Sequence, residues 1–550
     1  MDLLKKTVAR SASFKLYTKG MVIPRFKGEV QNDMATRAKY SRDASLFKVM
    51  PQAVVFPHDA DDVKALVAFA NANAHLGITL TARAAGTDMS GGPLTESFVV
   101  DFARHMNHVR AVGYGTAVTE PGVLYRDFAK AIAAQGFLLP SYTASRDLCA
   151  VGGMVANNAG GEKTLTYGKT DKYVRRLTVV LADGNEYLFR PLLAFELRKK
   201  MRQADFEGGI YRDMYCLVTE NAALLKAARP TVSKNSAGYA LWDIWDGKIF
   251  DLTKLFTGSQ GTLGMITEIE FKTIRPKKHS RLLVIFLNDL APLCDIVAAT
   301  LTHHPESFES YDNHTLWLAM RYMLFRFAWQ FIPEIFMVAR NGGFPQLVLL
   351  AEFTGDSKSE ALLKARTAMH GLARFKCAMR VSSSAKDAEK YWAIRRESFN
   401  LLRAKIKGRQ TAPFVDDIIV PPESLSQFLP ELNALFTPYK NDMTYTIAGH
   451  AGNGNFHIIP LMDLASLRVR RIIPMLTDAV YALVIRYGGS ITAEHNDGIV
   501  RTPYLPQMYG AEVYALFEKT KRIFDPQNIF NPHKKVGGTK EYALSHMRTE

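Results

Sequence analysis

The chain has 550 residues, a length that exceeds one hydrophobic core of ordinary size and predicts two or three domains. Its content of 47% hydrophobic and 11% aromatic residues excludes intrinsic disorder. The formal net charge of +16 favours an anionic partner, either a membrane surface or an anionic substrate. Nucleic acid is disfavoured, because the basic residues are spread thinly and form no recognisable nucleic-acid motif.

Strands and a helix follow one another in order from residue 46. A strand is predicted at 53–56, a helix from Asp61 and a strand at 78–83, and the acidic helix start suits the positive end of the helix dipole. Further strands are predicted at 97–102, at 176–189 (a hairpin with Asp183-Gly184 at its turn) and at 261–276. This pattern predicts one α+β unit over residues 46–276.

Three other segments complete the predicted organisation. Residues 1–45 are basic and weakly patterned, and we expect an arm that lies on another surface. A second unit over residues 277–488 opens with a strand at 281–287 and contains helices and further strands. The last segment, 489–550, carries an apolar-periodic helix at 511–524.

Segment 316–340 is apolar around nearly the whole helical circumference, yet it contains three arginines. Arginine near the centre of a spanning helix is costly, so a transmembrane span is disfavoured. Two interpretations stay open: a helix in the plane of a membrane surface, or a buried helical pair with its arginines paired.

The cysteines and the N-terminus lead us to expect a cytoplasmic protein. The four cysteines include no C-x-x-C pair, so iron–sulfur clusters, cysteine zinc sites and a disulfide framework lack support. The first 20 residues lack the apolar stretch of a secretory signal.

Two loops rich in small residues point to a nucleotide cofactor. The stretches "RAAGTDMSGG" (83–92) and "CAVGGMVANNAGGEKTLTYGKT" (149–170) would let backbone N–H groups approach a diphosphate closely. Tight turns would explain one such loop more easily than two. Neither loop fits the dinucleotide fingerprint or the P-loop, which disfavours ordinary NAD binding and phosphoryl transfer.

Together with "KNSAGY" (234–239) and "GSQGTLGMITEIEF" (258–271), these loops resemble the FAD-binding PCMH-type domain of the vanillyl-alcohol oxidase superfamily. The nearest branch is similar to D-lactate dehydrogenases, the glycolate oxidase flavin subunit and D-2-hydroxyglutarate dehydrogenases. The resemblance covers roughly residues 45–537. It implies an α+β fold with a two-subdomain FAD-binding domain, an α+β cap domain for the substrate, and a C-terminal helical segment that returns to the FAD domain.

The resemblance implies FAD as cofactor and two sets of binding residues. Those of the first loop would cradle the pyrophosphate: Arg83, Ala84, Ala85, Gly86, Thr87, Asp88, Ser90, Gly91 and Gly92. Those of the later loops would line the adenosine and isoalloxazine regions: Val151, Gly152, Gly153, Ala156, Asn157, Asn158, Gly168, Gly261, Gly264 and Ile266.

The stretch "GHAGNGNFH" (449–457) could by residue type alone be a metal-binding loop, a phosphate cradle or a tight turn. The resemblance implies a divalent metal (Zn, Mn or Fe) held by His450, His457 and Glu494, with His495 as the catalytic base. Two imidazoles and one carboxylate leave open positions, as a catalytic site requires. The alternative is that these histidines are structural.

A helix at 391–399, "YWAIRRESF", resembles the substrate-arginine helix of the family. It implies that Arg395 binds the substrate carboxylate, since a guanidinium matches two oxygens. Arg396 is expected to be solvated. Phe399 and Val415 stand near the places where hydroxyglutarate enzymes hold the second carboxylate, which favours a lactate-like substrate.

The sequence is thus interpreted as an FAD-dependent dehydrogenase that oxidises a D-2-hydroxy acid and passes electrons to an external acceptor. That acceptor would be a quinone, a cytochrome, an electron-transfer flavoprotein or a separate iron–sulfur subunit. The basic charge and segment 316–340 favour a peripheral protein at the inner face of a membrane. Three alternatives stay open: an oxidase using dioxygen, a non-redox flavin transferase, and an inactive protein that binds membranes or nucleic acid.

Overall fold

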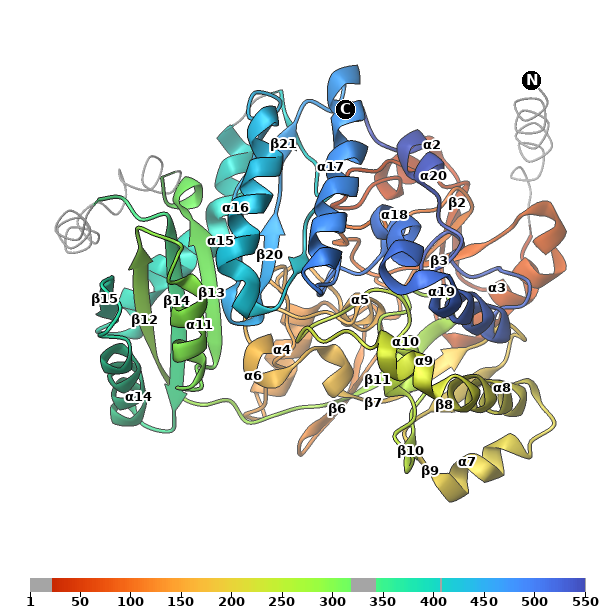
Figure 1. Cartoon of the computed structure of the whole chain (residues 1–550). Helices are drawn as coiled ribbons and strands as arrows, with labels where there is room; N and C mark the ends of the chain where they lie inside the picture. The colour runs from red at the N-terminus through yellow and green to blue at the C-terminus, as the bar shows by residue number, and fades with distance from the viewer. Residues whose placement is uncertain (1–21, 318–342, 406–407, 550) are drawn as a thin grey trace.

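The computed structural model describes residues 22–317, 343–405 and 408–549 (Figure 1). Most of segment 316–340 lies outside the described residues, and so do the first 21 residues of the basic arm. The described chain forms an α+β fold in which two sheets of the N-terminal half are joined to one large sheet of the second half.

A four-stranded sheet opens the first half, in the order β1-β2-β4-β3. Its strands are β1 (Glu29–Gln31), β2 (Ala53–Phe56), β3 (Leu80–Arg83) and β4 (Phe98–Asp101). The pairs β2–β4 and β3–β4 are parallel, whereas β1 adds to β2 as an antiparallel edge strand. Strands β2 and β4 are buried along their whole length, as expected of parallel strands covered on both faces.

A five-stranded antiparallel sheet follows, in the order β5-β6-β11-β7-β8. Its strands are β5 (Val109–Gly113), β6 (Thr116–Thr119), β7 (Val174–Val180), β8 (Glu186–Phe189) and β11 (Met265–Lys272). Strands β7 and β8 form the hairpin predicted around Asp183-Gly184, and Gly184 supplies the positive φ of the turn. The two strands β9 (Leu192–Leu193) and β10 (Ile249–Phe250) pair separately.

Helices cover these two sheets and connect their strands (Figure 1). They are α2 (Met34–Tyr40), α3 (Ala60–Ala72), α4 (Tyr125–Ala133), α5 (Val151–Asn157), α6 (Thr164–Tyr167), α7 (Ala194–Met201), α8 (Phe206–Glu220), α9 (Ala222–Ala228) and α10 (Thr253–Phe256). Helix α3 begins with acidic residues, as predicted: Asp59 caps its N-terminus, and Asp61 and Asp62 lie in its first turn.

The second half is built on a seven-stranded sheet, in the order β15-β12-β14-β13-β19-β20-β17. Its strands are β12 (His279–Leu287), β13 (Ser307–Asp312), β14 (Leu347–Gly355), β15 (Ala378–Val381), β17 (Ile418–Ile419), β19 (Ile447–His450) and β20 (Asn455–Ile458). A small sheet lies beside it, formed by β16 (Gln410–Thr411), β18 (Met443–Thr444) and β21 (Leu461–Met462).

The large sheet is covered on both faces, so its central strands β13 and β19 are buried along their whole length although they carry polar residues. In β12, Leu283 and Ile285 belong to the core that includes residues of α11 (Leu293–Leu301), α14 (Lys358–Gly371), α16 (Leu425–Phe436) and α17 (Leu467–Arg486). The alternate residues Leu282 and Val284 pack with α15 (Ala385–Lys405) on the other face. Alternation of side chains along a strand therefore places α15 on one face of the sheet.

The C-terminal segment returns to the N-terminal half, as the sequence predicts. It contains α18 (Gly498–Arg501), α19 (Leu505–Phe524) and α20 (Lys540–Ser545). After α19, the backbone of Ile529 and Asn531 bonds to Leu80 of β3, with N–O distances of 2.7 and 3.0 Å. The Asn531 side chain donates to the carbonyls of Gly92 and Gln260 at 3.0 and 2.6 Å, which ties two of the predicted FAD loops together.

Within the described residues, no helix is both long enough and apolar enough to cross a bilayer.

Candidate active site

The predicted histidine loop is a hairpin between β19 and β20. A short 3-10 turn, η7 (Ala451–Asn453), joins the strands, and Ala448 faces His457 across the pair. Because side chains alternate along a strand, His450 and His457 lie on the same face as Ala448. Their Nε2 atoms are 3.2 Å apart, so the two histidines of "GHAGNGNFH" meet as the sequence predicts.

Gly454 closes this hairpin in a left-handed conformation with φ of 72°. A Cβ at this position would also collide with the backbone oxygen of Val420. A non-glycine residue in the left-handed conformation costs about 1–3 kcal/mol of stability. We expect Gly454→Ala to lower the free energy of unfolding by more than this and to displace His450 and His457. Chemical denaturation measures the loss. Gly488→Ala is the matched control, because Gly488 has φ of 67° with no atom near its missing Cβ; equal losses would contradict the steric argument.

The loop carrying Glu494 and His495 is held by one buried carboxylate, Asp417. Its Oδ2 accepts the backbone N–H groups of Ala493, Glu494 and His495 at 2.9, 2.8 and 2.7 Å. The hydroxyl of Thr492 donates to the same oxygen at 2.6 Å. Several N–H groups on one carboxylate make a strong anchor, so this loop has a fixed position opposite the histidine hairpin.

The predicted metal ligands converge. Glu494 Oε1 lies 2.9 Å from His450 Nε2, and the ligand atoms of His450, His457 and Glu494 all lie within 4.8 Å of one another. Zinc bonds of about 2.0–2.2 Å to nitrogen and oxygen require ligand atoms about 3.3 Å apart. The donor set therefore fits a divalent transition metal in both type and spacing.

A buried lysine, Lys234, also contacts this cluster. Its Nζ lies 2.5 Å from Glu494 Oε1 and 3.2 Å from Asn455 Oδ1. Burial disfavours the charged form of Glu494, but Lys234 and His450 hold the pKa of its carboxyl well below the usual range. Glu494 is thus ionised, and it would need to lose no proton before binding a cation.

A second carboxylate, Asp416, contacts two of the site histidines. Its Oδ2 lies 2.6 Å from His495 Nδ1, and its Oδ1 lies 3.3 Å from His457 Nδ1. The rings of His457 and His495 stack with centroids 5.0 Å apart. Burial lowers the pKa of His495, but the charges of Asp416 and Asp417 raise it to about 9. Because the hydrogen bond to Asp416 engages Nδ1 of His495, Nε2 is the nitrogen of that ring left for the site.

The predicted substrate arginine joins the site through Glu309 of β13. Glu309 Oε1 lies 2.5 Å from His450 Nδ1, and its Oε2 accepts Arg395 Nε at 3.1 Å. Helix α15 therefore brings Arg395 beside the predicted metal ligands. The expectation that Arg396 is solvated is wrong: it forms a two-oxygen ion pair with Glu162 of the N-terminal half, at 3.0 and 3.1 Å.

The predicted FAD loops meet one another around Asp88 and Gln260. Asp88 accepts the backbone N–H of Gly92 at 2.6 Å and the Asn157 side chain at 2.9 Å. Gln260 donates to Ser90 Oγ and to Asn157 Oδ1, both at 3.2 Å. The first loop, the end of α5 and the turn before Gly261 therefore form one continuous surface.

Several residues predicted to bind FAD make contacts that support the fold. Arg83 donates to the carbonyls of Tyr40 and Arg42, and its guanidinium lies where a Cβ on Gly86 would be. Gly168 ends α6, whereas Gly264 packs tightly against β7 just before Ile266 in β11. Contacts of these residues with FAD stay predictions.

At Gly153, the surface formed by these loops leaves room for the diphosphate of a cofactor. A Cβ there would meet only the Cβ of Ala84, at 3.7 Å, so the backbone near the start of α5 is open toward the first loop. Such openness permits close approach of a ligand to backbone N–H groups.

The same loops border the histidine cluster. A Cβ on Gly160 would lie 3.1 Å from Glu494 Oε2. Lys169 donates to the carbonyls of Ala493 and Asn235 at 2.8 and 2.6 Å, and burial lowers its pKa to about 8. The predicted cofactor surface and the predicted catalytic groups therefore form one site.

Asp416, Asp417, Glu309 and Lys234 were not predicted as site residues. Asp416 and Asp417 stand in "FVDDIIVPP", where two adjacent acids before an apolar run were the available signal. Glu309 lies 141 residues from His450 in sequence, and no local pattern marks it.

Comparison with protein families supports this architecture. Residues 51–187 match the FAD binding domain, and residues 276–535 match the C-terminal domain of FAD linked oxidases.

Three relatives match most of the chain. D-2-hydroxyglutarate dehydrogenase of Pseudomonas putida is 29% identical over 96% of this chain, although the match covers 52% of that protein. The chain thus spans about half the length of that relative. Glycolate oxidase subunit GlcD of Bacillus subtilis is 27% identical over 91% of this chain and 92% of its own length. D-lactate dehydrogenase of Anaerostipes hadrus is 28% identical over 88% of this chain and 90% of its own.

Solved structures share the fold at low sequence identity. The 4-ethylphenol oxidase from Gulosibacter chungangensis superposes with a TM-score of 0.68 at 16% identity, covering 97% of this chain and 98% of that one. An alkyldihydroxyacetonephosphate synthase gives a TM-score of 0.66 at 16% identity, covering 95% of this chain and 86% of that one. In this chain a region that matches the FAD binding domain is therefore followed by one that matches the C-terminal domain of FAD linked oxidases, within the fold that these solved structures share.

Proposed function

We propose that the protein is an FAD-dependent dehydrogenase that oxidises a D-2-hydroxy acid to the 2-oxo acid. The observation that carries this proposal is the convergence of three imidazoles, a carboxylate and a guanidinium beside the FAD loops. Relatives named D-2-hydroxyglutarate and D-lactate dehydrogenase support the same chemistry. A bound divalent cation would lower the pKa of the substrate hydroxyl, and bound FAD would supply N5 as the acceptor of the C2 hydride.

The side chains of this chain divide the remaining tasks. His450, His457 and Glu494 would hold the cation. A cation bound beside His495 would disfavour its protonated form and so oppose the rise of its pKa to about 9. The neutral ring would then take the hydroxyl proton at Nε2, since Asp416 engages its Nδ1. Arg395, oriented by Glu309, would bind the substrate carboxylate.

The test is an anaerobic absorption spectrum of the purified protein with a panel of acids. We expect yellow protein whose flavin band is bleached by a D-2-hydroxy acid and stays bleached until an electron acceptor is added. D-lactate, D-2-hydroxyglutarate and glycolate are compared, with L-lactate as the stereochemical control; we propose D-lactate as the fastest. Rapid reoxidation by dioxygen would identify an oxidase, no bleaching by any acid would favour a non-redox transferase, and colourless protein would favour an inactive binding protein.

We also propose that an external acceptor receives the electrons: a quinone, a cytochrome, an electron-transfer flavoprotein or a separate iron–sulfur subunit. The net charge of +16 supports peripheral attachment to an anionic membrane, the proposed source of quinone. Retention of the full chain on anionic vesicles at low salt, and its release at high salt, tests attachment; equal recovery with neutral vesicles would contradict it.

Loss of the cation ligands should separate catalysis from FAD binding. We expect His450→Ala to reduce zinc content and to slow flavin bleaching by at least about 100-fold, because one ligand and the contact to Glu309 are both lost. Bound FAD should stay near one equivalent. His533→Ala, in the exposed turn before α20, is the control for histidine removal. Full bleaching activity of metal-free His450→Ala would contradict the metal assignment.

A further inference from the structure

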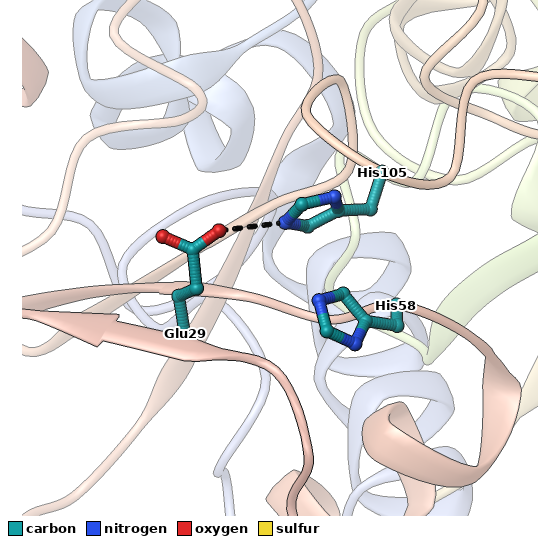
Figure 2. Close-up of side chains that lie close together, drawn as sticks. All are labelled: Glu29, His58 and His105. Carbon is teal, nitrogen blue, oxygen red and sulfur yellow. Dashed lines mark hydrogen bonds and ion pairs between the residues drawn. The ribbon is translucent and has the colours of Figure 1, made fainter.

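A separate group of potential metal ligands, drawn in Figure 2, lies on the four-stranded sheet rather than on the seven-stranded sheet that carries the histidine hairpin. Glu29 is the first residue of the edge strand β1, and His58 follows β2 by two residues. His105 lies in the loop after β4. Because β1 pairs with β2 and β2 with β4, three distant segments of sequence bring these side chains to one place.

The geometry suits a small divalent cation. His105 Nε2 lies 2.9 Å from Glu29 Oε1, and one ligand atom from each of the three residues lies within 4.8 Å of the others. The two imidazole rings meet edge to face, with centroids 4.4 Å apart. Zinc needs ligand atoms about 3.3 Å apart. Since His58 is exposed, its ring can make the small rotation that this spacing requires.

Neighbouring side chains orient Glu29 without using the oxygen that faces the histidines. Arg104 Nη2 lies 2.9 Å from Glu29 Oε2, and Gln31 donates to that same oxygen at 3.3 Å. The Arg104 guanidinium in turn lies over the Phe56 ring, 4.5 Å from its centroid. Supporting bonds of this kind fix the ligand orientation in metal sites. The positive charge of Arg104 also opposes a cation, so we expect exchangeable binding.

His58 distinguishes this cluster from a plain ion pair. Within the described part of the chain, the His58 ring contacts His105 but forms no hydrogen bond or ion pair. An ion pair between Glu29 and His105 alone leaves the His58 imidazole without a polar interaction among the described residues. A metal ion would use all three side chains.

We propose that Glu29, His58 and His105 form a second, peripheral site for a divalent transition metal, with zinc as its expected occupant. The two nitrogens and one carboxylate oxygen would leave a position for water, as in other three-ligand zinc sites. Bound metal would fasten the edge strand β1 to the ends of β2 and β4. The site would therefore stabilise the attachment of the N-terminal segment to the FAD-binding half.

The test counts zinc in the full-length flavoprotein. The protein is stripped with a chelator, dialysed against buffered zinc and measured by elemental mass spectrometry. We expect Glu29→Gln and His58→Ala to bind one equivalent fewer than wild type. The matched control is His108→Ala, which removes another exposed imidazole three residues beyond His105 and leaves the cluster intact. His457→Ala should lose the equivalent of zinc bound at the candidate active site instead. The two sites are therefore tested independently of each other.

A second measurement follows the strand itself. Zinc should slow hydrogen exchange at the β1 amides of wild type and of His108→Ala by at least about threefold, and should leave Glu29→Gln unchanged. Flavin bleaching should be the same in Glu29→Gln and wild type. Equal zinc content in wild type, Glu29→Gln and His58→Ala would overturn the proposal, as would zinc-independent exchange in β1 of wild type.

Discussion

The His495→Asn variant should bind FAD but should reduce it with a D-2-hydroxy acid about 10²–10⁴-fold more slowly than wild type, the range expected for loss of a general base. Asparagine can still meet Asp416 with its amide, in place of the Nδ1 contact of 2.6 Å. It offers no basic nitrogen at the position of Nε2. Stopped-flow measurement of flavin bleaching at saturating acid isolates this step from reoxidation.

Two controls make that result specific. Dithionite should reduce the flavin of His495→Asn and of wild type equally, which shows that the cofactor is bound and accessible to electrons. The zinc content should also be unchanged, because the proposed ligands are His450, His457 and Glu494; a loss of zinc would instead place the cation in the neighbouring group of Asp416, His457 and His495. Bleaching by acid within threefold of the wild-type rate would remove His495 from the role of base.

Much of the fold follows from local sequence patterns. The strand at 53–56 forms where a continuous apolar run predicts it, and the hairpin around Asp183-Gly184 forms where turn residues predict it. The histidine hairpin also forms from residues close in sequence, because His450 and His457 belong to two strands joined by the four residues 451–454. Such features are predictable since the residues that determine them are neighbours in sequence.

The supporting groups of the site could not be predicted in this way. Asp416 comes from the segment next to β17, and Glu309 comes from β13. Both meet the histidine hairpin only because the seven-stranded sheet places β13 beside β19 and β17 beside β20. Arg396 is a similar case: its ion pair with Glu162 depends on how α15 packs against the FAD-binding half. Non-local strand order and domain packing leave no periodic signal in the chain.

Asp416→Asn should impair both metal binding and proton transfer, because one carboxylate contacts His457 and His495. An ionised carboxylate at Nδ1 favours the tautomer with its proton on Nδ1 and a lone pair on Nε2. An amide can donate to Nδ1 and so favour the opposite tautomer, in which Nε2 carries the proton. We expect zinc affinity to fall about 10–100-fold. Flavin bleaching should slow about 10²–10⁴-fold, as when other histidines lose an orienting aspartate.

The neighbouring Asp417→Asn separates this positioning role from plain structural support. Asp417 accepts three backbone N–H groups and contacts the loop rather than the imidazoles, so its loss should mainly lower the melting temperature. Asp416→Asn should melt closer to wild type yet lose more zinc affinity, and Asp416→Glu should restore part of that affinity. If Asp416→Asn instead lowered the melting temperature as much as Asp417→Asn and kept wild-type zinc affinity, Asp416 would be a structural residue and the tautomer argument would fail.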